Sequence, residues 1–531
     1  MGSAALAPYL CDMTEPPVPS SSASVQGAAK RACDAAPASS DVTLGPLVYA
    51  RGYDPNSSRH QLSILVATQE GAAPPDLRVE GASGPAPEVI AVDTLGGHDF
   101  WRFDLSVTAG DTCYGVGRLR HTLTLPAPDD DLAVAFVSCN GKEHGDFERP
   151  EGERDAMWLR LAARHANAPL SLLIMGGDQI YADAALDAHP DLSRWAEAPP
   201  RERLEIDATP EAEAAVTAVF LDRWVRSVRS PSVARLMAEV PSVAMWDDHD
   251  IFDGYGSHPA PVQESPLGQM IYRIARRFFR LFQAGGHLPQ SPATLSRTLA
   301  QPGFAVIAPD LRSERQKRRV MGEAGWRATE EGFARARPGE PVFVLSSVPA
   351  LGPRLSLVEA VHKLIPGAQR YEDDLRDQWQ SRAHRDEWRR FLRLAAGHAD
   401  ETGPVTFLSG EIHLAGRGEM RTPQGTILHQ LIASGISHPP PPRVFARALG
   451  ALGALGEAPL SGHPIRIRTL PGQVRRYAAE RNYLLLTRQR GAWQARWDLE
   501  HSGMTPALSL PSGPPAASPR SKRDGLEAVA L

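Results

Sequence analysis

Residues 172–183 read LLIMGGDQIYAD, and this stretch carries the clearest signal in the chain. Its first four residues are apolar and run into Gly176 and Gly177, a pattern that predicts a short buried strand ending at the glycines. Asp178 and Tyr181 follow this strand. Because open α/β sheets hold their sites at the carboxyl ends of strands, we expect both side chains at a functional site. A Gly-Asp pair is also common at ordinary turns, so the stretch needs support from elsewhere in the sequence.

The composition of the 531-residue chain is that of a soluble globular protein, with 42% hydrophobic residues and a formal net charge of -5. This balance gives no overall attraction to nucleic acid, and we predict no specific nucleic-acid partner. No apolar run is long enough to predict a membrane span. The four cysteines are too few for a disulfide framework, and the first residues contain neither a signal peptide nor a twin-arginine motif. We therefore expect a cytoplasmic protein, whose oligomeric state the sequence does not predict.

Changes in composition divide the chain into four segments. Residues 1–42 and 506–531 are rich in Pro, Ser and Ala, and we predict disordered tails there. Residues 43–128 contain short extended runs separated by Gly, Pro and Asn, which predicts a small antiparallel β-sandwich domain of immunoglobulin or fibronectin type. In 129–505 strand-like runs alternate with helical patterns, which is typical of an α/β catalytic domain. Within it, 439–472 is interpreted as irregular.

The apolar patterns of the α/β segment predict its individual elements. The helix at 271–282 has apolar residues at helical spacing and is interpreted as a packed amphipathic helix rather than a membrane-surface one. The final hairpin turns at Arg490 and Gly491. Expected strands are 132–137, 172–175, 243–246, 305–308, 342–345, 405–408, 429–433, 484–487 and 492–499, and expected helices are 155–166, 211–228, a short one from 232, 271–282 and 373–396.

Four of the strand-like runs end in residue types that bind metals. The ends read VSCN from Val137, GDQIYAD from Gly177, WDDHD from Trp246 and SGEIH from Ser409. Besides the Gly-Asp turn, the other three ends each have an alternative interpretation: the cysteine can be a small buried hydrophobe, the acidic turn a helix cap, and the last histidine a core residue. Four independent strand ends with ligand types would be a coincidence, so together they predict a metal centre of two ions. Asp178 is the best placed bridge, and the phenol oxygen of Tyr181 suits Fe³⁺.

The motifs FVSCN, GGDQIYAD, WDDHDIFDGYG and LSGEIHLA resemble the metal-binding blocks of the alkaline phosphatase D (PhoD-like) metallophosphoesterases. The stretch APDLRSERQKRRVMG resembles the arginine-bearing block of the same family, and the resemblance covers roughly 133–437. It implies a four-layer α/β/β/α sandwich preceded by a small all-β sandwich domain. It also implies two or more metal ions, Fe³⁺ with Ca²⁺, with Mn, Zn, Co and Mg as alternatives. The family's usual aspartate in the last block is replaced here by Glu411.

The resemblance and the chemistry of the side chains together give a set of expected site residues. His249 is suited to protonate a leaving oxygen, with Asp250 as the carboxylate that orients its ring, and Arg312 or Arg315 can clamp phosphate oxygens. The loop that contains His438 resembles the one that closes the family's site. Expected metal ligands are Cys139, Asp178, Tyr181, Asp248, Glu411 and His413; expected catalytic residues are His249, Asp250 and Arg312; expected substrate contacts are Asn140, Arg315 and His438.

The function implied by the resemblance is metal-dependent hydrolysis of a small phosphate ester by a metal-bound hydroxide. The sequence does not distinguish a monoester from a diester. One alternative is a nuclease-type phosphodiesterase on the same site, which a strongly basic cleft would favour. The other is a non-catalytic binding scaffold that retains the fold, although such a protein would be expected to lose metal ligands first.

Overall fold

The strand predicted at 172–175 lies inside a large mixed sheet. In the computed structural model, β8 (Leu132–Val137), β9 (Leu172–Gly176) and β10 (Ser242–Met245) run parallel, so their carboxyl ends lie along one edge. Every residue of these three strands is buried, which explains why they read as unbroken apolar runs. The strand order is β22 (Gly503–Met504), β21 (Ala492–Leu499), β20 (Asn482–Gln489), β8, β9, β10, β1 (Leu44–Asp54), β2 (Arg59–Gln69), β5 (His98–Thr108) and β4 (Val89–Leu95), with β23 (Leu508–Ser509) paired to β21.

A second sheet is built from later strands, and its central members are also parallel. Alternate side chains of β8, such as Val134 and Phe136, share one apolar core with Val344 and Phe407 of this second sheet. The two sheets therefore bury a common layer of side chains. The strand order is β11 (Arg297–Gln301), β12 (Phe304–Ala308), β13 (Val342–Leu345), β14 (Val405–Ser409), β16 (Ile427–Ile432), β15 (Ala415–Arg421), β18 (His463–Arg468) and β17 (Glu457–Leu460), with β19 (Tyr477–Ala478) paired to β15.

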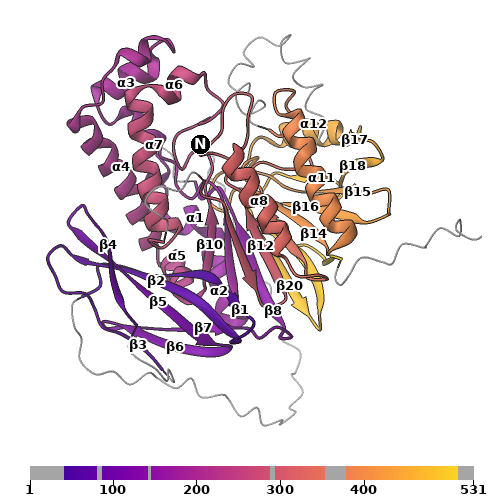
Figure 1. Cartoon of the computed structure of the whole chain (residues 1–531), viewed down its shortest axis with the longest axis horizontal. Helices are drawn as coiled ribbons and strands as arrows, with labels where there is room; N and C mark the ends of the chain where they lie inside the picture. Colours follow the sequence, from indigo (N-terminus) through magenta and orange to yellow (C-terminus); the bar gives the residue numbers. More distant parts are fainter. Residues whose placement is uncertain (1–40, 81–86, 142–144, 288–293, 353–377, 512–531) are drawn as a thin grey trace, which may run out of the picture. The chain divides into compact units, whose positions relative to one another are not determined.

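Helices cover the outer faces of these sheets (Figure 1). The other set of β8 side chains, Ala133, Ala135 and Val137, packs in a core with helices of the first half of the chain. Trp326 and Phe391 belong to helices that pack with the second sheet. The helices of the first half are α1 (Glu151–Arg154), α2 (Ala156–Asn167), α3 (Pro190–Glu197), α4 (Pro210–Arg229), α5 (Pro231–Glu239), α6 (Ala260–Glu264) and α7 (Pro266–Phe278); those of the second are α8 (Glu323–Arg335), α11 (Arg385–Glu401) and α12 (Arg443–Gly453).

The strands expected to form a separate β-sandwich are present, but they are joined to the large sheet. β3 (Leu77–Val79), β6 (Gly110–Val116) and β7 (Leu119–Leu125) form a three-stranded sheet that packs on β1, β2 and β5 around Ile64, Phe103 and Tyr114. β1 is also paired in parallel with β10, through Tyr49 and Ser242. The N-terminal strands thus extend the sheet that carries the site, and a separate all-β domain is not confirmed.

The structure describes residues 41–80, 87–141, 145–287, 294–352 and 378–511. Most of the tails expected at 1–42 and 506–531, and the start of the helix expected at 373–396, lie outside these ranges. Within them, no helix has the length and apolar character needed to cross a membrane. The predicted strands at 132–137 and 342–345 have the observed bounds. The helix expected at 271–282 is found as α7, which begins earlier at Pro266, and a π-helical turn at Phe279–Gln283. Its apolar residues are buried.

The interpretation of 439–472 as irregular is wrong, because this segment forms α12, β17 and β18. The pattern was missed for a physical reason. Helix α12 buries the small residues Ala446 and Gly450 beside the partly buried Leu449 and exposes Val444 and Phe445, so its large apolar residues lie on both sides of the helix.

Candidate metal centre

The residues that follow three buried strands adopt an unusual backbone conformation. Cys139 after β8, Asp178 after β9, and Glu411 and His413 after β14 have φ values of 51°, 54°, 61° and 50°. This left-handed region is unfavourable for residues other than glycine, and such strain gathers at functional sites. Only two other non-glycine residues in the described ranges, Ser58 and Arg490, have positive φ. The turns that carry the predicted ligands are therefore held in place against a conformational cost.

Four predicted ligands converge on one point. Cys139 Sγ and the phenol oxygen of Tyr181 each lie 3.5 Å from Oδ2 of Asp178. The same phenol oxygen lies 3.1 Å from Nε2 of His413. These donors come from the ends of β8, β9 and β14, so both sheets contribute. One thiol, one carboxylate, one phenol and one imidazole at these separations form a set of ligand atoms that can surround a single transition-metal ion.

A second group of ligand atoms shares a member with the first. Oxygen atoms of Asp178, Asp247 and Asp248 lie within 4.8 Å of one another, and all three residues are buried. Asp178 also belongs to the group with Cys139 and His413, whose ligand atoms likewise lie within 4.8 Å of one another. It is therefore positioned to contact both groups, which agrees with the bridging role predicted for it.

The electrostatics of Asp178 favour a bound cation. Burial, then the neighbouring carboxylates of Asp247 and Asp248, raise the pKa of Asp178 well above its ordinary value. Its Oδ1 atom is buried and meets no hydrogen-bond donor among the described residues. Burial and Asp178 likewise raise the pKa of Cys139, although Ser434 Oγ lies 3.1 Å from the sulfur. A buried group of this kind costs free energy unless a cation compensates the charge, so the donor set fits a metal.

His413 is suited to bind as a neutral ligand. Burial, together with the nearby rings of His438 and His249, lowers the pKa of His413 well below its ordinary value. The ring is stacked on that of His438 with centroids 3.6 Å apart. A neutral imidazole has one nitrogen with a free lone pair, which is the form that coordinates metals.

His249 is held by Asp183 and not by the carboxylate we expected. Its Nδ1 atom lies 2.7 Å from Oδ2 of Asp183, while Nε2 lies 3.9 Å from Oδ1 of Asp253. Burial alone would lower the pKa of His249, but Asp183 and Asp248 raise it well above its ordinary value. The ring is stacked on Tyr181, with centroids 4.3 Å apart. His249 is thus a partly exposed, proton-carrying group beside the two ligand groups.

Asp250, predicted to orient His249, instead fixes the backbone of two loops. Its Oδ2 accepts hydrogen bonds from the amides of Asp178 and Asp247, at 3.0 and 2.9 Å. Its Oδ1 accepts from the amides of Gln179 and Ile180. Burial raises the pKa of Asp250 to about 7, although these amides lower it. The prediction for Asp250 is wrong in this respect, because its carboxylate is engaged by backbone amides and Asp183 is the carboxylate that contacts Nδ1 of His249.

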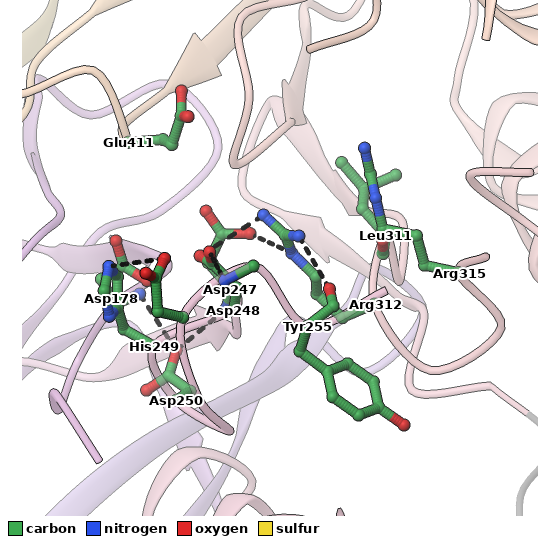
Figure 2. Close-up of polar contacts among 12 residues, drawn as sticks. Asp178, Asp247, Asp248, His249, Asp250, Tyr255, Leu311, Arg312, Arg315 and Glu411 are labelled. Atoms are coloured by element: carbon green, nitrogen blue, oxygen red, sulfur yellow. Dashed lines mark hydrogen bonds and ion pairs between the residues drawn. The ribbon is translucent and has the colours of Figure 1, made fainter. Parts of the chain in front are cut away.

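Arg312 points at the acidic group, whereas Arg315 does not (Figure 2). The guanidinium of Arg312 donates to Oδ1 of Asp247 and to Oδ1 of Asp248, and it also donates to the carbonyl oxygen of Tyr255. It therefore positions the two aspartates. Arg315 is buried and donates to the carbonyl oxygen of Leu311 at 3.4 Å. Both arginines are buried and donate to protein oxygens, so the structure shows them engaged by the protein and not presented as the phosphate clamp that we predicted.

Glu411 lies apart from the acidic group and points away from it (Figure 2). Both of its carboxylate oxygens accept hydrogen bonds from Nε2 of Gln378, at 2.7 Å. It belongs to none of the ligand groups found among the described residues. Gln378 thus holds the side chain of Glu411 apart from the ligand groups, and the structure does not bring it together with the other ligands predicted from the motif.

Asn140 and His438 differ in how they face the site. The amide of Asn140 is buried and fully engaged: it donates to Ser227 Oγ at 2.8 Å and accepts from Trp158 Nε1 at 2.7 Å. It positions the loop, and the substrate contact we predicted is not supported by this geometry. The ring of His438 lies over Tyr181, with centroids 5.3 Å apart, and beside His413, so it remains at the edge of the candidate site.

Three acidic residues of the site were absent from the predicted set, namely Asp183, Asp247 and Asp253. Asp183 closes the stretch that first indicated a site, and Asp247 lies inside the acidic turn. Asp253 forms a third ligand group with Asp248 and His249. Their positions within the motifs are a signal, but which acid of each run points inward depends on the loop conformation.

The fold and the site define a class: a mixed α/β protein with two parallel-centred sheets and, at the strand ends, a centre suited to two metal ions. Residues 138–289 match the family model described as "PhoD related phosphatase". A solved structure described as "Structure of PhoD" covers 90% of this chain and 94% of its own, with a TM-score of 0.51 and 13% identity, so the likeness is one of fold. The match over residues 138–289 supports a PhoD-like family, the one that the motifs resemble.

Two further similarities are weaker. A Saccharomyces cerevisiae protein described as "Uncharacterized protein YGR266W" is 23% identical over 421 residues. The alignment covers 61% of this chain and 59% of that protein, so this chain spans little more than half of its relative. A structure described as "GAP50 the anchor in the inner membrane complex of Plasmodium" has a TM-score of 0.36 and 8% identity, and covers 72% of this chain and 89% of its own.

Proposed function

We propose that this protein is a metal-dependent phosphoric ester hydrolase of the alkaline phosphatase D type. The observation that carries the proposal is the position of Asp178, which belongs both to the group with Cys139 and His413 and to the group with Asp247 and Asp248. Two adjacent ligand sets with a shared carboxylate suit two cations, the arrangement used to hydrolyse phosphate esters. The similarity to PhoD related phosphatases supports the same chemistry.

The ligand types favour different ions at the two positions. Cys139, Asp178, Tyr181 and His413 would hold a transition metal, for which we propose Fe³⁺ because of the phenol oxygen. Asp178, Asp247 and Asp248 offer oxygen atoms only, which suits a hard cation such as Ca²⁺. When bound, two such cations would supply the positive charge that neutralises phosphate oxygens and activates water for hydrolysis.

The chain's own residues supply the proton and the alignment. Asp183 raises the pKa of His249, and its Nε2 lies 3.9 Å from Oδ1 of Asp253 beside the ligand groups, so His249 can donate a proton to the leaving oxygen of the ester. Arg312 keeps Asp247 and Asp248 in place, and Asp250 keeps the loops of Asp178 and Asp247 in register. In this proposal both act by positioning and do not contact the substrate.

We retain two expectations within this proposal. The first is the four-layer α/β/β/α arrangement, supported by the shared core of the two sheets and by the helical cores outside them. The second is a small phosphoester substrate in the cytoplasm, which rests on the sequence.

The proposal is tested by hydrolysis of a chromogenic phosphate monoester and of the matching diester. The purified chain is stripped with a chelator and reloaded with single metals or with Fe³⁺ and Ca²⁺ together. We expect turnover only after reloading, and its loss in Asp178→Asn, whereas the exposed-surface control Asp386→Asn stays active. Full activity in the stripped protein or in Asp178→Asn would refute the proposed centre. Metal binding without turnover of either ester would favour the scaffold alternative.

A further inference from the structure

Helix α12 carries large apolar residues on its exposed side as well as on its packed side, where Leu449 contacts the core cluster of Ile467 and Tyr477. Its fully buried positions include Ala446 and Gly450, which are small. Val444 is 71% exposed, Phe445 is 44% exposed, and Leu455, just beyond the helix, is 65% exposed. A surface helix normally turns its large apolar residues toward the core and its polar residues toward water. The outward face of α12 is therefore suited to contact something other than water.

The exposed apolar residues form a continuous stripe. Val444, Ala448, Ala451 and Leu455 recur at helical spacing and are all exposed. On the neighbouring loop, Val474 is 92% exposed, the highest value among the exposed large apolar residues of the described ranges. This loop lies against the helix, because Arg476 donates a hydrogen bond from Nη1 to the carbonyl oxygen of Gly450 at 3.4 Å.

The charge around this stripe is strongly positive, although the whole chain has a net charge of -5. Residues 439–479 contain six arginines and a single acidic residue, Glu457, which is paired with Arg385 at 3.3 Å. Arg443, Arg447 and Arg475 are exposed beside the apolar residues. An exposed apolar stripe flanked by arginines and without free acids is the pattern of a helix that lies in the plane of a membrane surface.

A groove beside the end of α12 adds a place for an anionic headgroup. It has a volume of about 770 Å³ and runs between the helix end and β17 and β18. Arg466, Arg468 and Arg476 line it next to Leu455. The groove is also lined by Glu457, which is paired with Arg385, and Arg468 is paired with Glu419 at 2.8 Å, so Arg466 and Arg476 are the arginines that we assign to the headgroup. The planar guanidinium of arginine binds phosphate oxygens well.

We propose that α12 and the adjoining loop dock this protein on an anionic lipid bilayer. We call Val444, Phe445, Leu455 and Val474, together with Arg443, Arg447 and Arg475, the docking face. Its apolar side chains enter the boundary between headgroups and acyl chains, and its arginines contact lipid phosphates. The docking is peripheral and reversible, and it is independent of the proposed hydrolase activity.

The experiment is co-sedimentation of the full-length protein with vesicles. One set is phosphatidylcholine alone and the other equimolar phosphatidylcholine and phosphatidylserine. We expect binding to the anionic set only, weakened by salt because part of the attraction is electrostatic. Arg443→Gln with Arg447→Gln should weaken binding about ten-fold or more, since each basic residue near an anionic surface contributes on the order of 1 kcal/mol. Val444→Asp with Leu455→Asp should abolish it.

Matched controls separate this surface from general effects of substitution. Leu204→Asp changes another exposed leucine, and Arg327→Gln with Arg335→Gln removes two exposed arginines that pair with glutamates on α8. Both controls should bind vesicles as the unchanged protein does, and circular dichroism should show all variants folded. Absence of binding to anionic vesicles overturns the proposal. So does equal binding by the Val444 and Leu455 variant, or self-association that the same variant abolishes, which would assign the face to a second copy of the chain.

Discussion

Nδ1 of His249 lies 2.7 Å from Oδ2 of Asp183, and the two residues are 66 positions apart in the chain. An ionised carboxylate can only accept, so the ring donates from Nδ1 and its tautomer and orientation are fixed. The other oxygen of Asp183 accepts from the amide of Asp253 at 2.7 Å, which ties the loop after His249 to the same carboxylate. Asp183 is thus a group that both orients the ring of His249 and raises its pKa.

Asp183→Asn should slow phosphoester hydrolysis on the order of 100-fold, because general acid catalysis contributes about that much or more. The amide can still accept from the loop but no longer stabilises the imidazolium. Metal content, measured by elemental analysis, should be unchanged. Asp187→Asn, a few residues further along the same loop region, serves as the control and should retain full turnover. Loss of metal in Asp183→Asn would show that the residue acts on the centre and not through His249.

Gly177→Ala should lower metal affinity. Gly177 has φ 104°, and an added Cβ would lie 2.8 Å from Cβ of Asp247, so the strand end or the aspartate must shift. The control is Gly397→Ala in α11, where nothing lies within 4 Å of the added Cβ. That change should stabilise the protein by roughly 0.5–1 kcal/mol, as alanine does in helices. Metal titration of both variants measures the difference, and equal affinities would contradict the expected shift of Asp247.

Tyr181→Phe should remove a visible absorption band from the iron-loaded protein. The phenol oxygen of Tyr181 lies 3.5 Å from Oδ2 of Asp178 and 3.1 Å from Nε2 of His413, close enough to join them as a ligand. A ferric phenolate absorbs visible light by charge transfer, and phenylalanine has no oxygen to bind. Tyr272→Phe, a partly buried tyrosine that is stacked on Tyr255 and not near these ligands, should keep the band. A colourless but active iron-loaded protein would contradict the assignment of Tyr181.

Glu411→Gln should leave the metal content unchanged, whereas Asp178→Asn should reduce it. Both oxygens of Glu411 accept from Gln378, and the residue lies outside the ligand groups of the described chain. Elemental analysis of the two variants, prepared in parallel, gives the comparison. If Glu411→Gln loses metal as Asp178→Asn does, the side chain must turn inward when the metal binds.

Glu239→Gln should destabilise the fold at neutral pH by about 1 kcal/mol, the scale of a partly exposed charged hydrogen bond. Glu239 lies 2.9 Å from Arg235, 3.3 Å from His165 and 3.5 Å from His121. Burial would raise the pKa of Glu239, but hydrogen bonds from His121, His165 and Arg235 lower it well below its ordinary value of 4.5.

A carboxyl group with a lowered folded-state pKa stabilises the fold above its unfolded-state pKa. That contribution is lost as the pH falls from the ordinary value of 4.5 toward the lower folded-state value. The difference between Glu239→Gln and the unchanged protein should therefore shrink in acid. Urea unfolding at neutral pH and in acid measures it, and a difference independent of pH would contradict the ionised state of Glu239.

Much of the fold was determined by the sequence alone. The strands at Leu132–Val137 and Val342–Leu345 were predicted with their observed bounds, because a strand buried on both faces is a short run of apolar residues whatever its neighbours are. The polar residues at the carboxyl ends of these strands were likewise visible, since parallel strands bring their ends to one edge. The structure gathers Cys139, Asp178, Tyr181 and His413 there.

The tertiary structure alone decided which acid faces which partner. Asp183 and not Asp250 holds His249, and Glu411 contacts Gln378, because the conformation of each loop decides which side chains meet. Sequence order does not encode that conformation. The continuity of β1 with β10, and the outward apolar face of α12, also depend on contacts between distant segments. The sequence thus determined the strands and the chemical types at their ends, and the packing of the loops determined the site.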